Sequence, residues 1–372
     1  MSSVYALSIH ADYKCRHSGV CCAVDWDVPV ELPIYRSLED IVRTGALRVV
    51  PDAGTLPPFI VEPDLPEEAA AILQRTDEGA CVFFERGSRL CVVHRDFGEA
   101  VLPATCRFFP RVALRDARGT SITLSHFCPT AASMLFRDDV PLGIVERPAA
   151  FPPADYDGLV AGAGDLPPLL HPAMLMDLDG YAAWERHMIA RCRADAAPET
   201  VLATLVRDAR LLRAWRPGTI ALGAAVAALP PSLAGGRPHG SLARSLELHA
   251  EVIAAVPDEL KPAPDEDRLD EAFRAAVVPY WDGLQRPINR YLAAKAFACW
   301  TAYQGRGVMS IVRGLEAALA LVRVEAARQC RDAARPLDAA LLLDAFRGAD
   351  FALNHLAVGE DLAAAWSRAE AE

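Results

Sequence analysis

The sequence lacks a long hydrophobic run. No stretch reaches the ~18–20 apolar residues that a membrane-spanning helix needs, and the nearest candidate, residues 220–229, is short and lies between prolines. The first ten residues have neither the basic start nor the long apolar segment of a secretory signal. We therefore expect a cytoplasmic protein without a membrane partner.

Positive charge is also scarce. The 372 residues include 38 Lys and Arg against 49 Asp and Glu, which gives a formal net charge of −11. This balance argues against nucleic acid as a partner, because nucleic-acid-binding proteins need a basic surface. Apolar residues make up 52% of the chain, which excludes a largely disordered protein and allows one or two hydrophobic cores.

Several enzyme motifs are missing. The sequence has no Gly-x-Ser-x-Gly, no P-loop and no His-Glu-x-x-His, so serine hydrolase, NTPase and zincin chemistry has no motif support. It also lacks the Cys-x-x-x-Cys-x-x-Cys triplet of radical S-adenosylmethionine enzymes. The glycine-rich stretch 162–165 follows no strand pattern and precedes two prolines, which favours a loop over a nucleotide-binding turn.

Cysteine, in contrast, is concentrated near the start of the chain. Seven of the ten cysteines fall within the first 128 residues, although even spacing would place three or four there. Structural disulfides are rare in a reducing cytoplasm, so such a group favours metal binding or catalysis. Thiolates are suitable ligands for zinc, copper(I) or iron–sulfur clusters. One tetrahedral zinc or one four-iron cluster uses four thiolates, so seven cysteines allow either two sites or one site with a free thiol. The candidate ligands are Cys15, Cys21, Cys22, Cys81, Cys91, Cys106 and Cys128.

The charge around these cysteines favours thiolates. Seven arginines and three carboxylates lie between residues 86 and 118, a local net charge of +4. Guanidinium groups lower the cost of negative charge on sulfur. Cys128 precedes Pro129, and proline is common at the first helical position, so we expect Cys128 at a helix N-terminus. The other three cysteines, Cys192, Cys299 and Cys330, lie in helical patterns and are expected to pack in a core.

Three histidines are candidates for additional ligands. His17, His94 and His126 each lie within three residues of a cysteine. Imidazole is a common metal ligand, although a histidine close to a metal site more often supports the ligands or lies at the surface than binds the metal itself. Asp25 and Asp27 are expected to be turn residues.

Four further side chains are candidates for supporting the site. Arg107 and Arg111 flank a Phe-Phe-Pro segment, where they would neutralise the thiolates or bind an anion. Tyr13 and Trp26 lie on either side of the first cysteine group and are expected to shield a metal from water by packing.

The distribution of proline predicts three parts. Residues 141–172 contain seven prolines, which block regular helix and indicate a connector. We therefore expect a cysteine module at 1–140, a connector at 141–175 and a helical domain at 176–372. The expected fold class is α+β, mainly α: a small irregular N-terminal cysteine-rich metal module packed on a C-terminal all-α region.

Hydrophobic periodicity predicts individual elements. In the first part, strands are expected at 28–30, 82–84, 90–93 and 121–125, and helices at 33–43 and 66–74. In the last part, apolar residues recur at helical spacing over 201–212, 246–256, 288–300, 311–322, 341–346 and 352–366.

The cysteine motifs carry a family resemblance. The first motif is Cys15-x-x-x-Gly19-x-Cys21-Cys22. It is followed by Trp26-Asp27-Val28, Leu90-Cys91, Thr105-Cys106-Arg107-Phe108-Phe109-Pro110-Arg111 and Phe127-Cys128-Pro129-Thr130. This order resembles the YkgJ-type cysteine-cluster proteins, described as zinc- or iron-chelating, and within them the FliB-type flagellin lysine N-methylases. The resemblance covers about residues 12–137, and Phe109 stands where that branch prefers tyrosine.

The resemblance implies an iron–sulfur cluster, or bound iron or zinc, held by the seven cysteines. It also implies transfer of methyl groups from S-adenosylmethionine to lysines of a protein or peptide substrate. Two alternatives stay open: a non-methylating metal-binding, redox or maturation-partner protein, and an iron-dependent oxidative modifying enzyme.

Overall fold

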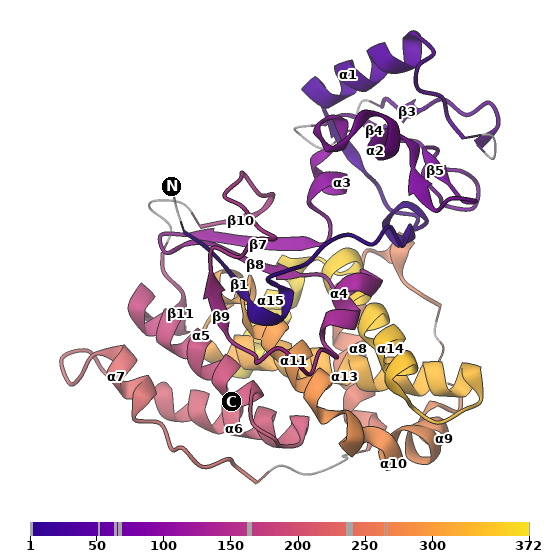
Figure 1. Ribbon diagram of the computed structural model, residues 1–372. Coiled ribbons are helices and arrows are strands. Elements are labelled where there is room, and N and C mark those ends of the chain that lie inside the picture. The colour runs from indigo at the N-terminus through magenta and orange to yellow at the C-terminus, as the bar shows by residue number, and fades with distance from the viewer. Residues whose placement is uncertain are drawn as a thin grey trace. The chain divides into compact units, whose positions relative to one another are not determined.

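The chain folds into two compact units. The computed structural model describes residues 3–50, 53–62, 65, 69–161, 166–235, 241–263, 265 and 267–371, so the loop expected at 162–165 lies outside the described residues. The smaller unit is Lys14–Arg111, and the larger unit combines Met1–Tyr13 with Val112–Glu372 (Figure 1). Helices account for 51% and strands for 12% of the structure, which confirms the α+β, mainly α fold class.

These units differ from the expected parts, because the boundaries at 140 and 175 both fall within the larger unit. Strand pairing explains the difference. Strand β1 (Val4–Leu7) pairs in parallel with β8 (Gly119–Leu124) and antiparallel with β9 (Ile144–Glu146). The start of the chain and the segment after residue 111 therefore share one sheet.

The larger unit is built on a five-stranded sheet in the order β10-β7-β8-β1-β9. Strand β7 (Arg111–Asp116) pairs in parallel with β10 (Gly158–Val160). Every residue of the central strand β8 is buried, as expected for a strand covered on both faces. A small hairpin of β11 (Leu169–His171) and β12 (Met174–Leu175) leads into the helices.

The longest helix of the larger unit is α13 (Val308–Ala333), which is buried along most of its length and packs against α14, α8 and α6 (Figure 1). The predicted helical repeats are confirmed as helices in most of their length. The repeat at 288–300 is shorter, because α11 ends at Ala296, and the last repeat is divided into the π-helix Ala352–Leu356 and α15. Cys192 and Cys330 are buried in helices, as expected, whereas Cys299 lies after the end of α11 and is partly buried against the core. The helices are α4 (Pro129–Met134), α5 (Leu178–Cys192), α6 (Pro198–Leu212), α7 (Leu222–Ala227), α8 (Leu242–Ala254), α9 (Leu269–Ala272), α10 (Val278–Trp281), α11 (Gln285–Ala296), α12 (Thr301–Gln304), α14 (Ala339–Phe351) and α15 (Gly359–Trp366).

The smaller unit is irregular. It contains a three-stranded antiparallel sheet of β2 (Pro29–Glu31), β4 (Ala69–Leu73) and β3 (Phe59–Ile60), and a hairpin of β5 (Phe84–Glu85) and β6 (Leu90–Cys91). Its helices are α1 (Leu32–Arg43), α2 (Val92–Phe97) and α3 (Ala104–Phe108). Helix α1 begins within a residue of its expected start and ends where the sequence predicted.

Two sequence predictions in this unit are wrong. The strand expected at 82–84 is a turn at residues 82–83, and strand β5 begins only at Phe84. A helix was expected over 66–74, but Ala69–Leu73 forms strand β4. Backbone hydrogen bonds to both β2 and β3 outweigh the helix preference of the three alanines. The strand expected at 90–93 is also shorter, because helix α2 begins at Val92.

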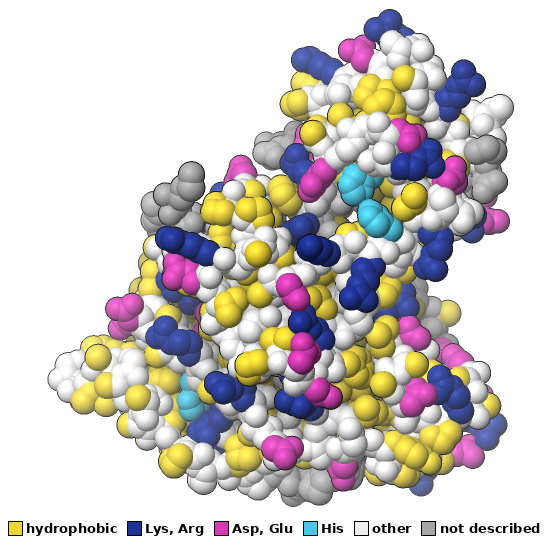
Figure 2. All heavy atoms as spheres, viewed as in Figure 1, with side chains coloured by type: hydrophobic (Ala, Val, Ile, Leu, Met, Phe, Trp, Pro, Cys, Tyr) yellow, Lys and Arg dark blue, Asp and Glu magenta, His cyan; other side chains and the backbone are white. Residues whose placement is uncertain are grey.

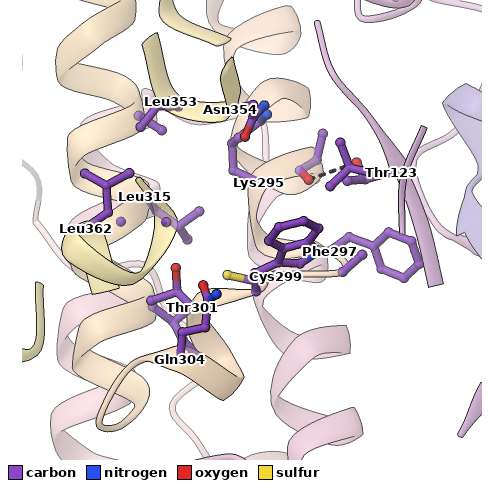
Figure 3. Close-up of a pocket in the computed structure, with 18 of the residues that line it drawn as sticks. Thr123, Lys295, Phe297, Cys299, Thr301, Gln304, Leu315, Leu353, Asn354 and Leu362 are labelled. Carbon is purple, nitrogen blue, oxygen red and sulfur yellow. Dashed lines mark hydrogen bonds between the residues drawn. The ribbon is translucent and has the colours of Figure 1, made fainter. Parts of the chain in front are cut away.

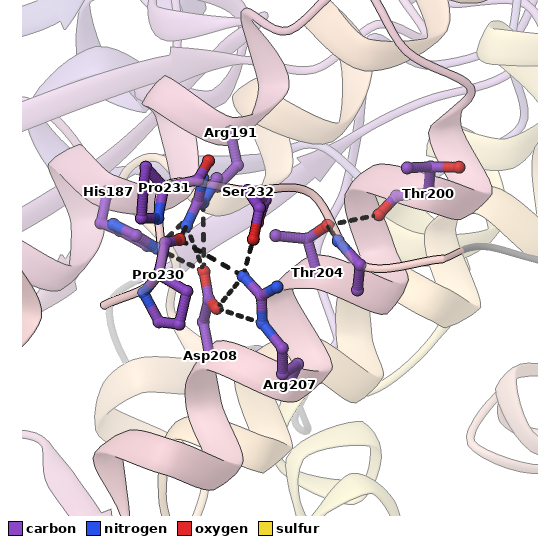
Figure 4. Close-up of polar contacts among 10 residues, drawn as sticks. His187, Arg191, Thr200, Thr204, Arg207, Asp208, Pro230, Pro231 and Ser232 are labelled. Atoms are coloured by element: carbon purple, nitrogen blue, oxygen red, sulfur yellow. Dashed lines mark hydrogen bonds and ion pairs between the residues drawn. The ribbon is translucent and has the colours of Figure 1, made fainter.

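A buried ion-pair cluster fixes the chain after α7. The carboxylate of Asp208 on α6 is fully buried and contacts His187 Nε2 at 2.8 Å, Arg191 Nη2 at 2.9 Å and Arg207 Nη2 at 2.7 Å (Figure 4). Arg191 and Arg207 also donate to the carbonyl oxygens of Pro231 and Ser232, each at 2.9 Å. This cluster therefore attaches an irregular segment to two helices.

The surface carries charge of both signs. On the face drawn in Figure 2, Lys and Arg side chains are interspersed with Asp and Glu side chains. The exposed pair of Arg286 and Asp138, 2.9 Å apart, is an example. Within the described residues, no helix is both long and apolar enough to cross a membrane.

Candidate metal centre

Five of the predicted cysteines gather in the smaller unit, although they come from four separate segments. Cys21 and Cys22 lie in the 3₁₀ turn Val20–Cys22. Cys81 forms an isolated β-bridge with Arg75. Cys91 ends strand β6, and Cys106 lies in helix α3.

Backbone hydrogen bonds hold these segments together. The N–H of Cys81 donates to the carbonyl oxygen of Cys22 at 2.8 Å, which joins the first two segments. Phe84 pairs with Cys91 in the β5–β6 hairpin, and the N–H of Val92 donates to the carbonyl oxygen of Phe83 at 2.9 Å. The thiols are therefore positioned by the main chain and not only by side-chain rotamers.

The thiols interact with one another. The sulfurs of Cys21 and Cys22 lie 3.8 Å apart, and Cys22 forms a second thiol hydrogen bond with Cys91. Cys81 and Cys106 lie close enough to the same group for thiolate charges on Cys21 and Cys91 to act on them. We call this neighbourhood of five side chains the thiol cluster (Cys21, Cys22, Cys81, Cys91 and Cys106).

The thiols of the cluster differ in pKa. Hydrogen bonding to Cys22 lowers the pKa of Cys21 and lowers that of Cys91 to about 7, with a further contribution to Cys91 from the backbone N–H groups of His94 and Val93. The same hydrogen bonds raise the pKa of Cys22, which keeps its proton. Burial raises the pKa of Cys81 to about 11 and that of Cys106 well above its usual range. The thiol cluster thus combines two thiols whose pKa is lowered with three whose pKa is raised.

A buried guanidinium that the sequence did not indicate lies beside the cluster. Arg75 donates through Nη2 to the carbonyl oxygen of Trp26 at 2.6 Å, while its Nε and Nη1 are buried without a hydrogen-bond partner. Its charge opposes the effect of burial on the pKa of Cys81 and Cys106. Arg75 lies eleven residues before the arginine-rich window, so no local charge signal pointed to it.

Most arginines of that window have other partners. Arg86 pairs with Glu78, Arg95 with Asp96 and Glu85, Arg115 with Asp155, and Arg118 with Asp116 and Glu185. Arg95 nevertheless contributes to the lowered pKa of Cys91. The excess positive charge read from the sequence is therefore largely neutralised by carboxylates elsewhere in the fold.

The two arginines predicted to support the site lie at the end of the smaller unit. The guanidinium of Arg107 lies over the ring of Phe108, 4.7 Å from its centre. Arg111 donates to the carbonyl oxygens of Arg107 and Phe108 at 3.2 and 3.4 Å. Trp26, predicted as a shield, packs edge-on against Phe109 with ring centres 5.5 Å apart.

Cys15, His17 and His94 lie in the same unit. Cys15 is exposed, and its sulfur accepts a hydrogen bond from the backbone N–H of His17 at 3.4 Å. The rings of His17 and His94 are 5.7 Å apart. These contacts bring the first cysteine of the motif and two predicted histidines near one another.

Cys128, His126 and Tyr13 belong to the larger unit. Cys128 is the N-cap of helix α4, as the following proline predicted, and its sulfur lies 3.6 Å from the hydroxyl of Tyr13. His126 is fully buried, with its Nε2 3.3 Å from Nε2 of His10. Its Nδ1 lies 3.4 Å from the carboxylate of Asp350.

The thiol cluster fits a thiophilic metal in its donor chemistry. Zinc–sulfur bonds of about 2.3 Å in a tetrahedron place two sulfurs roughly 3.8 Å apart, and Cys21 and Cys22 have that separation. Buried sulfur donors also suit iron–sulfur clusters. As the side chains stand, the described part of the chain contains no group of three or more His, Cys, Asp or Glu that could hold a metal ion, so binding would draw the remaining thiols closer.

Comparison of the chain with protein-family models, curated proteins and solved structures gives no match. The resemblance to the cysteine-cluster proteins therefore stays a prediction from the motifs.

Proposed function

We propose that the smaller unit binds zinc or an iron–sulfur cluster through thiolates of the thiol cluster. The observation that carries this proposal is the convergence of five thiols from four chain segments on one partly to fully buried place. Burying thiols as a hydrophobic core does not require an unpaired guanidinium beside them, whereas a set of thiolates does benefit from one.

The pKa pattern supports a cation at this place. A bound metal replaces thiol protons and removes the cost of burying sulfur charge. Four thiolates complete one zinc site or one four-iron cluster, which leaves the fifth thiol spare. All ten cysteines are free, which favours a reducing compartment such as the cytoplasm as the place where the protein works.

Anaerobic purification followed by iron, sulfide and zinc analysis tests the proposal. We expect about one equivalent of zinc, or about four of iron with matching sulfide and a visible charge-transfer band. Metal contents below roughly a tenth of an equivalent for both elements, before and after reconstitution, would contradict it.

Serine variants separate the thiol cluster from other cysteines. Cys91→Ser and Cys106→Ser should lose metal and unfold at lower temperature, because metal-binding energy contributes to folding in such modules. Cys192→Ser and Cys330→Ser are the matched controls, since both thiols are buried in helices of the larger unit. Equal metal content in all four variants would locate the metal elsewhere.

Lysine methylation is the catalytic form of this proposal, and the resemblance of the cysteine motifs supports it. It requires binding of S-adenosylmethionine, which calorimetric titration of the metal-loaded protein measures. It also requires a protein or peptide substrate whose lysines gain 14 Da per methyl group by mass spectrometry. Metal binding without either result would favour a carrier, redox or maturation role, and oxygen-dependent modification of a substrate would favour the iron-dependent oxidative enzyme.

A further inference from the structure

A cavity of about 130 Å³ lies inside the larger unit (Figure 3). Helices α13 and α15 and the π-helix Ala352–Leu356 supply an apolar wall that includes Leu315, Leu362 and Leu353. An engineered apolar cavity of ~150 Å³ in another protein stays dry and binds benzene. This cavity therefore suits a ligand with a hydrocarbon body of roughly six carbon atoms and is too small for a nucleoside cofactor.

Aromatic side chains form another part of the wall. Phe297 and Trp300 follow helix α11, and Trp366 is the last residue of α15. Trp300 Nε1 donates to the carbonyl oxygen of Ala113 at 3.0 Å, which fixes the orientation of its ring. Contacts between aromatic rings are more favourable than their buried area alone accounts for. A ligand with an aromatic ring therefore gains more from this wall than a saturated chain of the same size.

The wall carries no net charge. Among the described residues that line the cavity, Lys295 is the charged one, and its Nζ lies 2.6 Å from Oδ1 of Asp350. The carboxylate of Asp350 is fully buried and also accepts a hydrogen bond from the hydroxyl of Tyr291 at 2.7 Å. The charge of Lys295 is therefore neutralised within the protein. An anion or a cation in the cavity would be buried without a counter-ion, which is unfavourable, so the cavity favours an uncharged ligand.

Two polar groups in the wall form no hydrogen bond with the described part of the chain. The carboxamide of Gln304 lies against Gly359, where a Cβ atom would be 3.5 Å from Oε1. Trp366 is 6% exposed, and its Nε1 is buried without a hydrogen-bond partner. An unpaired buried N–H group costs about 1–3 kcal/mol. An oxygen atom on an uncharged ligand would supply the acceptor that this wall lacks.

The backbone around the cavity is irregular at two places. Ala298, which lines the cavity, has a φ of 53°, a left-handed conformation that is costly for alanine. On another wall lies the π-helix Ala352–Leu356, and π-helical turns occur frequently at functional sites. Figure 3 shows Gln304 at one end of the cavity and Asn354 and Lys295 at the other. The uncharged carboxamide of Gln304 is therefore separated from the ion pair.

We propose that this cavity binds an uncharged aromatic molecule of one ring that carries a hydroxyl or carbonyl oxygen, with this oxygen hydrogen-bonded to the carboxamide of Gln304. The apolar and aromatic wall favours burial of the ring. The neutralised charge of Lys295 excludes ligands that carry a charge of either sign. The proposal is independent of metal binding by the thiol cluster, because the described lining residues all belong to the larger unit.

Calorimetric titration at pH 7 with phenol, toluene, benzoate and benzylamine tests the proposal. Phenol and toluene are uncharged and similar in size but differ in the oxygen, whereas benzoate and benzylamine are charged. We expect phenol to bind roughly threefold to tenfold more tightly than toluene, as one added hydrogen bond predicts, and both charged probes to bind more weakly than toluene. The proposal is overturned if no probe binds at millimolar concentration, or if toluene or either charged probe binds as tightly as phenol.

Variants that change the size of the cavity locate the binding. Ala318→Leu places a larger side chain in the wall and should abolish binding of phenol and toluene, whereas Ala333→Leu at the exposed end of α13 should leave it intact. Leu315→Ala enlarges the cavity and should admit 2-naphthol, which the unaltered protein should exclude. Unchanged phenol affinity in a folded Ala318→Leu variant refutes the site. If circular dichroism shows that this variant does not fold, failure of Leu315→Ala to bind 2-naphthol refutes it instead.

A third variant tests the hydrogen bond. Gln304→Leu keeps a side chain of similar size but removes the carboxamide, so phenol should bind no more tightly than toluene, whose own affinity should stay the same. An advantage of phenol over toluene that persists in Gln304→Leu would overturn the assignment of Gln304 as the partner of the ligand oxygen.

Discussion

The guanidinium of Arg75 is attached to the backbone of Trp26, because its Nη2 donates to the Trp26 carbonyl oxygen at 2.6 Å. That contact leaves Nε and Nη1 buried and without a partner. An unpaired buried N–H group costs about 1–3 kcal/mol, so the fold retains this arginine at a cost. Thiolates or cluster sulfurs in the thiol cluster would be the acceptors that recover it.

Replacement of Arg75 should therefore weaken metal binding. Loss of a group that supports metal ligands typically reduces affinity about 10–100-fold, and we expect Arg75→Met to fall in this range, with partial recovery in Arg75→Lys. Competition with a chromophoric chelator measures the affinity for zinc. Arg86→Met is the control, because Arg86 pairs with the exposed Glu78 on the surface, and equal affinities in the Arg75 and Arg86 variants would refute the role of Arg75.

Alkylation should distinguish the cysteines of the metal-free protein. The pKa of Cys91 is about 7 through hydrogen bonding to Cys22, whereas burial raises the pKa of Cys81 to about 11. Iodoacetamide at pH 8 should therefore modify Cys91 before Cys81, since the thiolate is the reactive form, and bound metal should protect both. Peptide mass spectrometry gives the order. Cys192, whose pKa burial raises to about 12, should stay unmodified until the protein unfolds, and identical rates at Cys91 and Cys81 would contradict the assignment.

Acid should destabilise the larger unit through Asp208. Burial acts to raise the pKa of this carboxyl, but hydrogen bonds and charge from His187, Arg207 and Arg191 outweigh it and lower the pKa. Because the folded-state pKa lies below the unfolded value of about 3.9, the stabilisation is complete above that value and is lost as the pH falls through the folded-state pKa. Asp208→Asn should cost roughly 3 kcal/mol at pH 7 and progressively less below pH 4.

Urea unfolding at pH 7 and pH 3 measures this difference. Asp138→Asn is the control, since the Asp138 side chain is 79% exposed and pairs with Arg286 at the surface. It should change the free energy of unfolding by less than about 0.5 kcal/mol at either pH. An Asp208→Asn cost that does not depend on pH would show that the charge of Asp208 is not the cause.

Gly180 should not tolerate a side chain. A Cβ atom there would lie 2.5 Å from Cδ2, 2.7 Å from Cγ and 2.9 Å from Cβ of Leu222, so helices α5 and α7 could not stay at their present separation. Gly180→Ala should cost about 1–3 kcal/mol, and Leu222→Ala in the same chain should recover part of it. Gly223→Ala is the control, because its nearest neighbour is 3.7 Å away. A neutral Gly180→Ala in urea unfolding would contradict this packing.

Local sequence was informative where one element decides the structure by itself. The repeats that predicted α6, α8, α11 and α13 are confirmed, because an apolar stripe at helical spacing favours a buried helix face whichever element packs against it. The proline after Cys128 likewise predicted the start of α4. Ala69–Leu73 shows the limit of this reasoning, because pairing with two strands outweighed the preference of the alanines.

Contacts between distant residues had no local signal. His126 was a candidate ligand because it lies two residues before Cys128, yet its ring lies beside His10 and Asp350. Lys295 carried no signal either, since a single lysine in an apolar helix has many roles. These residues come together only because strand β1 pairs with β8 and helix α11 packs against the same sheet. One contact between α11 and the sheet is the hydrogen bond that Thr123 Oγ1 donates to the carbonyl oxygen of Ala294.

By itself, the sequence determined the mainly helical composition and the absence of an apolar run long enough to span a membrane, and it showed that seven of the ten cysteines lie early in the chain. Tertiary structure alone decided which cysteines meet, that Arg75 is beside them, and that Lys295 and Asp350 pair at the wall of a cavity. The physical reason is the range of the interactions: periodicity and capping act within a few residues, whereas burial and charge pairing join side chains that only the folded chain brings together.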